Sequence, residues 1–146
     1  MALYSLAQRT QYQFSDFPLW EIIPPTTRKV LVREVGAILT ASGTPTDLAW
    51  GRSNAIGLNP QTPQLAQPED ANSAPATTMH AIGWVTPPGL SAYWRRYAAP
   101  GNIGAGVIWT FPRGFALLQV SGAGSGVVWN IATGAPACDV WATVDE

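Results

Sequence analysis

Few side chains in this sequence could carry out chemistry. The 146 residues include one histidine, His80, one cysteine, Cys138, and nine carboxylates spread along the chain. A zinc site needs several histidine, cysteine or carboxylate ligands at one place. A serine–histidine–aspartate triad can assemble from distant residues, but the G-x-S-x-G turn that presents the serine in many hydrolases is absent. The residue types therefore predict no metal, no cofactor and no catalytic residue, and we do not expect an enzyme.

Two short stretches imitate functional motifs. Residues 122–126 read GAGSG, which resembles a phosphate-binding loop, but the lysine and serine or threonine of that motif do not follow. Glu69 and Asp70 supply two carboxylates, yet adjacent side chains diverge, whereas glycoside cleavage needs two that face one bond. We expect a turn and a solvated loop at these places, and a small hydrolase is only the third hypothesis for function.

The chain carries little charge. Charged residues make up 12% of the sequence and hydrophobic residues 47%, against a typical charged share of roughly 25%. This shortage indicates that a partner covers part of the surface, with a monomer coated in serine, threonine, glutamine and asparagine as the alternative. The net charge is −1 and the basic residues are scattered, which predicts no nucleic-acid binding. No signal peptide and no long apolar run are seen, so no membrane segment is expected.

The sequence pattern favours short strands. Thirteen prolines and fourteen glycines interrupt the chain too often for a set of long helices. Period-two alternation predicts single strands over 29–40, 47–52, 77–85 and 91–98, and hairpins that pair 107–111 with 115–120 and 126–131 with 138–144. A helix over 91–99 is the alternative that the aromatic residues and the following proline and glycine disfavour. Residues 54–76 are predicted to form one long loop.

The predicted fold is all-β. We expect a two-sheet antiparallel β-sandwich, jelly-roll-like, over residues 29–146, preceded by residues 1–28 as an N-terminal arm or first strand. In the first sandwich strand, one face is predicted to carry Leu31, Arg33, Val35, Ala37 and Leu39, with Gly36 as a possible bulge.

The isolated histidine and cysteine are expected to be structural. Cys138 alternates with Val140, Ala142 and Val144, which predicts a small buried side chain rather than a reactive thiol. His80 lies in a strand pattern and is expected to be a structural residue in the wall of the sandwich, with its hydrogen bonds satisfied.

Several segments, taken together, resemble small virion proteins of tailed bacteriophages. They are MALYSLAQRT, GAILTASGTPT, AQPEDANSAP, YWRRYAAPGNIGAGVIWTFPRG and VVWNIATGAPACDVWATVDE. They are most similar to head decoration (cement) proteins, β-sandwich or jelly-roll subunits that sit on the major capsid shell. The resemblance implies the major capsid protein as partner, a homo-oligomer (a trimer by analogy), a place on the outer surface of the head, and synthesis in the host cytoplasm. It carries over no catalytic residue.

Two groups of residues are candidate interface residues. The first lies in the segment 1–28, an apolar arm that a lone domain would struggle to bury: Tyr4, Tyr12, Phe14, Phe17 and Trp20. The alternative is that the first ten residues form the first strand. The second group, Trp94, Arg95 and Arg96, would also suit a receptor-binding tail module. The leading hypothesis is capsid decoration, and the alternative is a phage tail or fibre module that binds host-surface glycans.

Overall fold

The computed structural model describes residues 2–11, 13–14, 16–131 and 134–146, and every regular element there is a β-strand. Eight strands form the framework: β1 Leu3–Arg9, β3 Phe17–Ile23, β4 Val30–Leu39, β5 Thr46–Ala55, β11 Gly89–Ala99, β12 Gly106–Leu117, β13 Gly126–Asn130 and β15 Cys138–Asp145. The short strands are β2 Gln13–Phe14, β6 Leu58–Pro60, β7 Gln64–Leu65, β8 Gln67–Pro68, β9 Met79–Ala81, β10 Trp84–Thr86 and β14 Gly134–Ala135. Among the described residues, no helix is long and apolar enough to cross a membrane.

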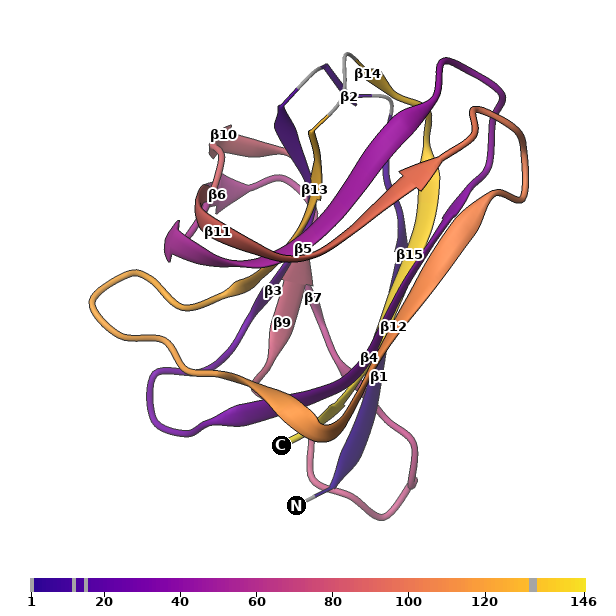
Figure 1. The fold of residues 1–146 in the computed structure, drawn as a ribbon. Coiled ribbons are helices and arrows are strands. Elements are labelled where there is room, and N and C mark those ends of the chain that lie inside the picture. Colours follow the sequence, from indigo (N-terminus) through magenta and orange to yellow (C-terminus); the bar gives the residue numbers. More distant parts are fainter. Residues whose placement is uncertain (1, 12, 15, 132–133) are drawn as a thin grey trace.

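The framework strands divide between two sheets (Figure 1). One sheet has the order β12-β4-β15-β1 and is extended by β8, and the other has the order β11-β5-β13-β3 and is extended by β9 and β7. Numbered one to eight along the chain, the framework strands follow the orders 6-3-8-1 and 5-4-7-2, the arrangement of a jelly roll. The framework pairings are all antiparallel. The predicted two-sheet, jelly-roll-like sandwich is confirmed.

The core lies between the two sheets and is filled from alternating positions. On β15 the alternation is regular, and Cys138, Val140, Ala142 and Val144 are all buried, as predicted. Trp50 on β5 is fully buried. A Cβ atom at Gly126 on the neighbouring β13 would lie 2.2 Å from the Cη2 atom of Trp50. The glycine is needed there because only a bare backbone leaves room for the indole.

Strand β4 exists as predicted, but its inward face changes along its length. Val35 points into the core, whereas Arg33 and Glu34 are consecutive residues that both remain partly exposed. The register with β15 shifts at this point, between Thr143 and Val144. The prediction of one continuous face from Leu31 to Leu39 is therefore wrong in its first half, because a bulge lies there and not at Gly36.

Both predicted hairpins are wrong. Strand β12 runs without reversal from residue 106 to 117. It pairs with β4 on both sides of a bulge at residues 111–114. Gly114 in this bulge has a φ of 75°, a conformation that favours glycine. Strands β13 and β15 belong to opposite sheets and do not pair with each other. Alternation predicts that a segment is a strand, but the same alternation fits a strand in either sheet.

Within residues 1–28, the described chain contains the framework strands β1 and β3 rather than a detached arm. Strand β1 pairs with β15 over seven residue pairs, and β3 lies between β13 and β9. Strand β1 agrees with the first-strand alternative for the first ten residues, whereas β3 was not predicted.

The predicted long loop is part of an insertion, residues 56–88, that contains the short strands β6 to β10. Strand β7 adds to one sheet and β8 to the other, so the chain passes between the sheets at Ala66, which is 2% exposed. The predicted strand 77–85 is divided into β9 and β10 by Ile82 and Gly83. The insertion covers the side of the sandwich at β1 and β3. The opposite side, at β11 and β12, has no such cover among the described residues.

Candidate functional site: an open seam of aromatic and cationic side chains

The uncovered side of the sandwich is bordered by two edge strands. Strand β11 pairs only with β5 and β12 only with β4 within the described chain. The two strands diverge from the loop that joins them, residues 100–105 (Figure 1). We call the contact zone between them the seam, and define it by five side chains: Arg52, Trp94, Arg95, Phe111 and Phe115.

A series of aromatic rings connects the seam to the core. The ring of buried Trp50 lies 6.5 Å from Phe111 and 5.7 Å from Phe115, measured between centroids. Phe115 in turn meets Trp94 edge-to-face at 5.3 Å. Trp94 is 49% exposed. A large solvent-facing ring is thus held by contacts that reach the interior, which limits the entropy that it would lose on binding a partner.

Two arginines lie over these rings. The guanidinium carbon of Arg52 is 5.5 Å from the Trp94 centroid and 5.2 Å from that of Phe115. Arg52 Nη2 also donates to the carbonyl oxygen of Ala116 at 2.6 Å. The guanidinium of Arg95 lies 5.8 Å from the centroid of Phe111, and its Nη1 donates to the Trp94 carbonyl oxygen at 2.9 Å. Cation–π contacts of this kind hold the charged groups in place while they keep their charge.

Two hollows flank these side chains. One, of about 460 Å³, is lined by Lys29, Arg52, Leu118 and Val120 together with small residues. The other, of about 390 Å³, is formed by Arg95 and the bulge residues 110–114, which include Arg113. Each lining combines two basic residues with apolar surface and contains no carboxylate.

The remaining basic residues are used differently. Each of the four forms an ion pair: Arg9 with Asp139, Arg28 with Glu146, Arg33 with Asp145, and Arg96 with Asp47. Four of the eight basic residues, which are scattered in the sequence, thus form these ion pairs, and the other four gather on the open side.

Two of the candidate interface residues from the N-terminal segment are in the core, which corrects their assignment. Tyr4 is 4% exposed and Trp20 is fully buried. The Tyr4 hydroxyl donates to the Ala74 carbonyl oxygen at 2.8 Å, and Trp20 Nε1 donates to Nδ1 of His80 at 3.0 Å. Both side chains hold the insertion against the framework, so neither presents a surface to a partner.

The other candidates have separate outcomes. Phe17 is half-buried on β3. Tyr12 and the side chain of Phe14 lie outside the described residues. Trp94 and Arg95 are exposed at the seam, whereas Arg96 is exposed but paired with Asp47 at 3.2 Å.

Sequence reasoning missed most of the seam. The residues that it missed come from three separate parts of the chain. They are Arg52, Phe111 and Phe115 of the seam, and Lys29 and Arg113 of the flanking hollows. Nothing in their local patterns distinguishes them from other strand residues. The pairing of β11 with β5 sets Ala92 opposite Arg52, and the packing of the two sheets brings Phe115 of β12 against Trp94.

A buried carboxylate, Glu21, is a second candidate for a site, and it is closed to solvent. Glu21 on β3 is fully buried, and its Oε1 accepts a hydrogen bond from Ser125 Oγ at 2.5 Å while Oε2 accepts one from the Gly57 amide at 3.2 Å. Burial raises the pKa of Glu21 to about 7, against the opposing effect of these hydrogen bonds. Ser125 Oγ also lies 2.6 Å from Ser53 Oγ. The group can exchange a proton near neutral pH, but no substrate can reach a side chain with no exposed surface.

His80 is not placed to act as a base. Its Nδ1 accepts the Trp20 hydrogen bond and lies 3.1 Å from Gln8 Oε1. Burial lowers the pKa of His80 to about 4, so the ring is neutral at physiological pH. Its described polar contacts, with Trp20 and Gln8, include no serine hydroxyl and no carboxylate. This agrees with the expected structural residue whose polar atoms are hydrogen-bonded.

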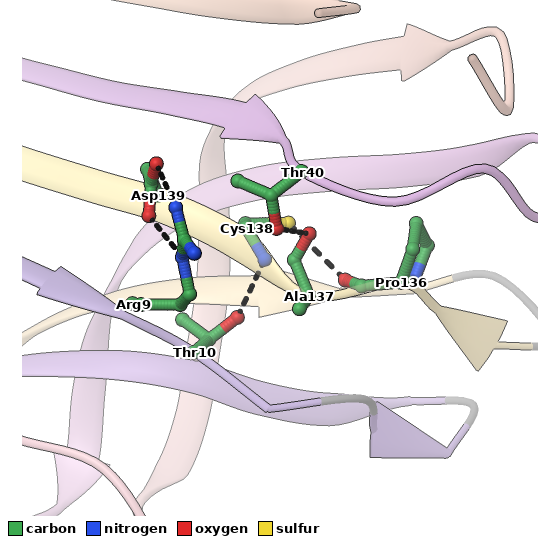
Figure 2. A network of polar contacts seen from close by, with 7 residues as sticks. All are labelled: Arg9, Thr10, Thr40, Pro136, Ala137, Cys138 and Asp139. Atoms are coloured by element: carbon green, nitrogen blue, oxygen red, sulfur yellow. Dashed lines mark hydrogen bonds and ion pairs between the residues drawn. The ribbon is translucent and has the colours of Figure 1, made fainter. Parts of the chain in front are cut away.

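Cys138 lies where β15 meets the ends of β1 and β4. Figure 2 shows the network of polar contacts around it, which involves Arg9, Thr10, Thr40, Asp139 and the main chain of Pro136 and Ala137. The Cys138 amide donates to Thr10 Oγ1 at 3.0 Å, and the Thr10 amide donates to the Cys138 carbonyl oxygen at 2.8 Å. Burial raises the pKa of the thiol to about 11, so it stays protonated and contacts the Pro136 carbonyl oxygen at 3.4 Å.

Within the parts of the chain that the structure describes, no three histidine, cysteine or carboxylate side chains gather as a metal site would require. No protein-family model, curated protein or solved structure matches this chain.

Proposed function

We propose that the chain is a structural virion protein, a decoration protein of a tailed bacteriophage that binds the major capsid shell through the seam. The observation that carries the proposal is an exposed tryptophan with two ring-stacked arginines, braced on the core at an open sandwich edge. Tryptophan and arginine are the residue types that dominate the binding energy of protein interfaces. The resemblance of the sequence to head decoration proteins adds support, as does the jelly-roll topology.

Attachment to a shell requires a rigid scaffold and one adhesive surface, without a reaction. The seam meets this requirement because its exposed ring is fixed by Trp50 and Phe115. Glu21 and His80, whose pKa values burial shifts to about 7 and about 4, are both buried. Neither side chain can meet a partner, which leaves the seam as the surface on which a partner can act.

The proposal is tested with heads from a phage that lacks the gene for this chain. Purified protein is mixed with these bare heads, and the bound fraction is measured by co-sedimentation. Trp94→Ala should weaken binding by about tenfold or more, because loss of an interface anchor costs about 2 kcal/mol. Arg9→Ala, at a distant exposed position of sheet β12-β4-β15-β1-β8, is the matched surface control. Absence of binding by the wild-type chain, or equal binding by Trp94→Ala, would contradict the proposal.

A tail or fibre module that binds host glycans is the second candidate. The observation that favours it is the half-exposed Trp94 ring beside two hollows, since sugars stack on such rings. The number of copies per virion separates the two functions: a decoration protein is present in hundreds and a tail module in a few dozen. Quantitative gel analysis of intact virions gives this number.

We include self-association in the proposal, with a trimer as the form that the resemblance implies. Its physical support is the low charge of the chain and the presence of long edge strands that pair on one side only. Sedimentation velocity at micromolar concentration tests it. A monomer at all concentrations would remove self-association from the proposal and leave the seam unaffected.

A further inference from the structure

The seam has a strong local charge in a chain that is nearly neutral. Its two hollows contain Lys29, Arg52, Arg95 and Arg113 and no carboxylate, whereas the whole chain has a net charge of −1. Lys29, Arg95 and Arg113 form no ion pair with any carboxylate in the described chain. A surface that gathers cations in this way is complementary to an anionic partner.

The backbone at the seam is also available. Strands β11 and β12 are 11 and 12 residues long, and each leaves one row of main-chain amide and carbonyl groups without a strand partner. An extended peptide can add to such an edge through main-chain hydrogen bonds, while its alternate side chains enter adjoining pockets.

The hollows favour a peptide over the other anionic polymers. Their linings contain no asparagine, glutamine, aspartate or glutamate, the side chains that bind sugar hydroxyls in pairs of hydrogen bonds. They offer apolar surface at Leu118, Val120 and Phe111, which suits aliphatic side chains. Single-stranded nucleic acid is bound through several successive stacking rings. At the seam, Trp94 is the one largely exposed ring.

We propose that the seam receives an extended acidic segment of the partner protein, which adds to an edge strand and sets its carboxylates against Lys29, Arg52, Arg95 and Arg113. The inference rests on the proposed function only for the identity of the partner as the capsid shell. The chemistry of the segment, alternating carboxylates and aliphatic side chains, follows from the seam itself.

The first experiment uses a synthetic probe. A fluorescein-labelled ten-residue peptide of alternating glutamate and valine is titrated with the full chain, and fluorescence anisotropy is recorded. The control peptide has glutamine in place of glutamate. We expect the acidic peptide to bind at least about tenfold more tightly than the control, and to lose about tenfold in affinity when salt rises from about 0.05 M to about 0.5 M.

Charge-reversal variants locate the binding. The double variant Arg95→Glu and Arg113→Glu should weaken the acidic peptide by about tenfold or more. Arg9→Glu changes the same kind of exposed side chain away from the seam and should change affinity by less than about twofold. Both residues of the double variant are exposed, so circular dichroism should show an unchanged β-sheet spectrum.

Three outcomes would overturn the inference. They are equal binding of the acidic and glutamine peptides, no binding of either, and tighter binding of oligodeoxythymidylate or a polyuronate in the same assay. The same variants are then tested on bare heads. If wild-type protein binds heads and the double variant binds equally well, the inference fails and the proposed function stands. If the acidic peptide binds at the seam but heads do not, the proposed function fails and the inference stands.

Discussion

The two lateral sides of the sandwich are built in opposite ways. On the side of β1 and β3, the insertion passes from one sheet to the other at buried Ala66 and is held by hydrogen bonds from both sheets. On the side of β11 and β12, the sheets end in two long edge strands, and Trp94 and Arg95 face solvent. The insertion seals one side of the jelly roll, and the open edges, where we propose that a partner binds, lie on the other side.

Charged groups follow the same division. The carboxylate of Glu146, only 1% exposed, accepts hydrogen bonds from the amides of Thr77 and Thr78 and from the Thr77 hydroxyl. Burial raises the pKa of this group, but the hydrogen bonds outweigh it and the net pKa is lowered. On the sealed side, the charge of Glu146 thus holds the insertion against the C-terminal end of the described sheet. At the seam, Arg52 and Arg95 instead lie over aromatic rings, and Arg95 is exposed to solvent.

The largest expected effect is the difference in stability between variants of Trp20 and Trp94, two tryptophans that were both predicted to be interface residues. Trp20→Ala on the sealed side should lower the free energy of unfolding by about 3–5 kcal/mol, because a fully buried ring and its hydrogen bond to His80 are lost. Trp94→Ala should lower it by less than about 1 kcal/mol, because the ring is half exposed. Urea unfolding of both variants measures the difference, and similar losses would contradict the comparison.

The next effect concerns the clamp that holds the insertion. Glu146→Ala should cost about 2–4 kcal/mol, because the amides of Thr77 and of the buried Thr78 lose their acceptor. Glu69→Ala removes an exposed carboxylate from the same insertion and should cost less than about 1 kcal/mol. Thermal unfolding compares them, and limited proteolysis should cleave the Glu146 variant faster within residues 69–78. A clamp variant as stable as the Glu69 control would show that the sealed side does not depend on this carboxylate.

Buried titratable groups predict a compensated pH profile. Glu21 has a pKa of about 7 in the folded chain against 4.5 when unfolded, so stability falls as pH rises through this interval. His80 has a pKa of about 4 against 6.5 when unfolded, so stability falls as pH drops through that interval. The two slopes, each about 1.4 kcal/mol per pH unit, oppose each other where the intervals overlap.

Substitution of Glu21 should uncover the slope that His80 contributes. In the Glu21→Gln variant, the free energy of unfolding should rise from pH 4.5 to 6.5, because only the His80 contribution remains. The wild-type chain and the control Glu69→Gln should be nearly flat over the same range. Urea unfolding at a series of pH values measures this, and identical profiles for the wild-type chain and Glu21→Gln would show that Glu21 does not titrate in this interval.

The smallest effect concerns Cys138, which lies on β15 between the two sides. With a pKa of about 11 and no exposed surface, its thiol should react with an aromatic disulfide reagent at pH 8 only at the rate of global unfolding. Cys138→Ala should cost about 1 kcal/mol. Rapid labelling of the native chain would mean that the sandwich opens locally at Cys138 without global unfolding.

The sequence was sufficient to predict several framework strands but not β3, and not the partners of the strands. Alternation correctly located β4, β5, β11 and β15, because a half-buried strand imposes a period of two on its own residues. It failed for the two hairpins, because the sheet to which a strand belongs is decided by distant pairings. A turn-like sequence, Pro112-Arg113-Gly114, proved to be a bulge within one long strand.

The candidate site was predicted only where a local cluster existed. Trp94 and Arg95 are adjacent in sequence and were found, whereas Arg52 and Phe115 reach them only through the sheets. The N-terminal aromatics misled because a proline-rich segment suggests irregular chain, yet Pro18 is accommodated and buried on β3. The gathering of basic residues that look scattered in the sequence is likewise a property of the fold alone.

The most direct test of the central claim, that the open seam is the binding surface, is hydrogen–deuterium exchange of the chain on bare phage heads. The free chain and the head-bound chain are compared by mass spectrometry of peptides that cover both sides of the sandwich. We expect binding to slow amide exchange in Gly89–Ala99 and Gly106–Leu117, and to leave Gln64–Leu65 and Met79–Ala81 unchanged. Protection confined to the sealed side, with β11 and β12 exchanging as in the free chain, would contradict the account.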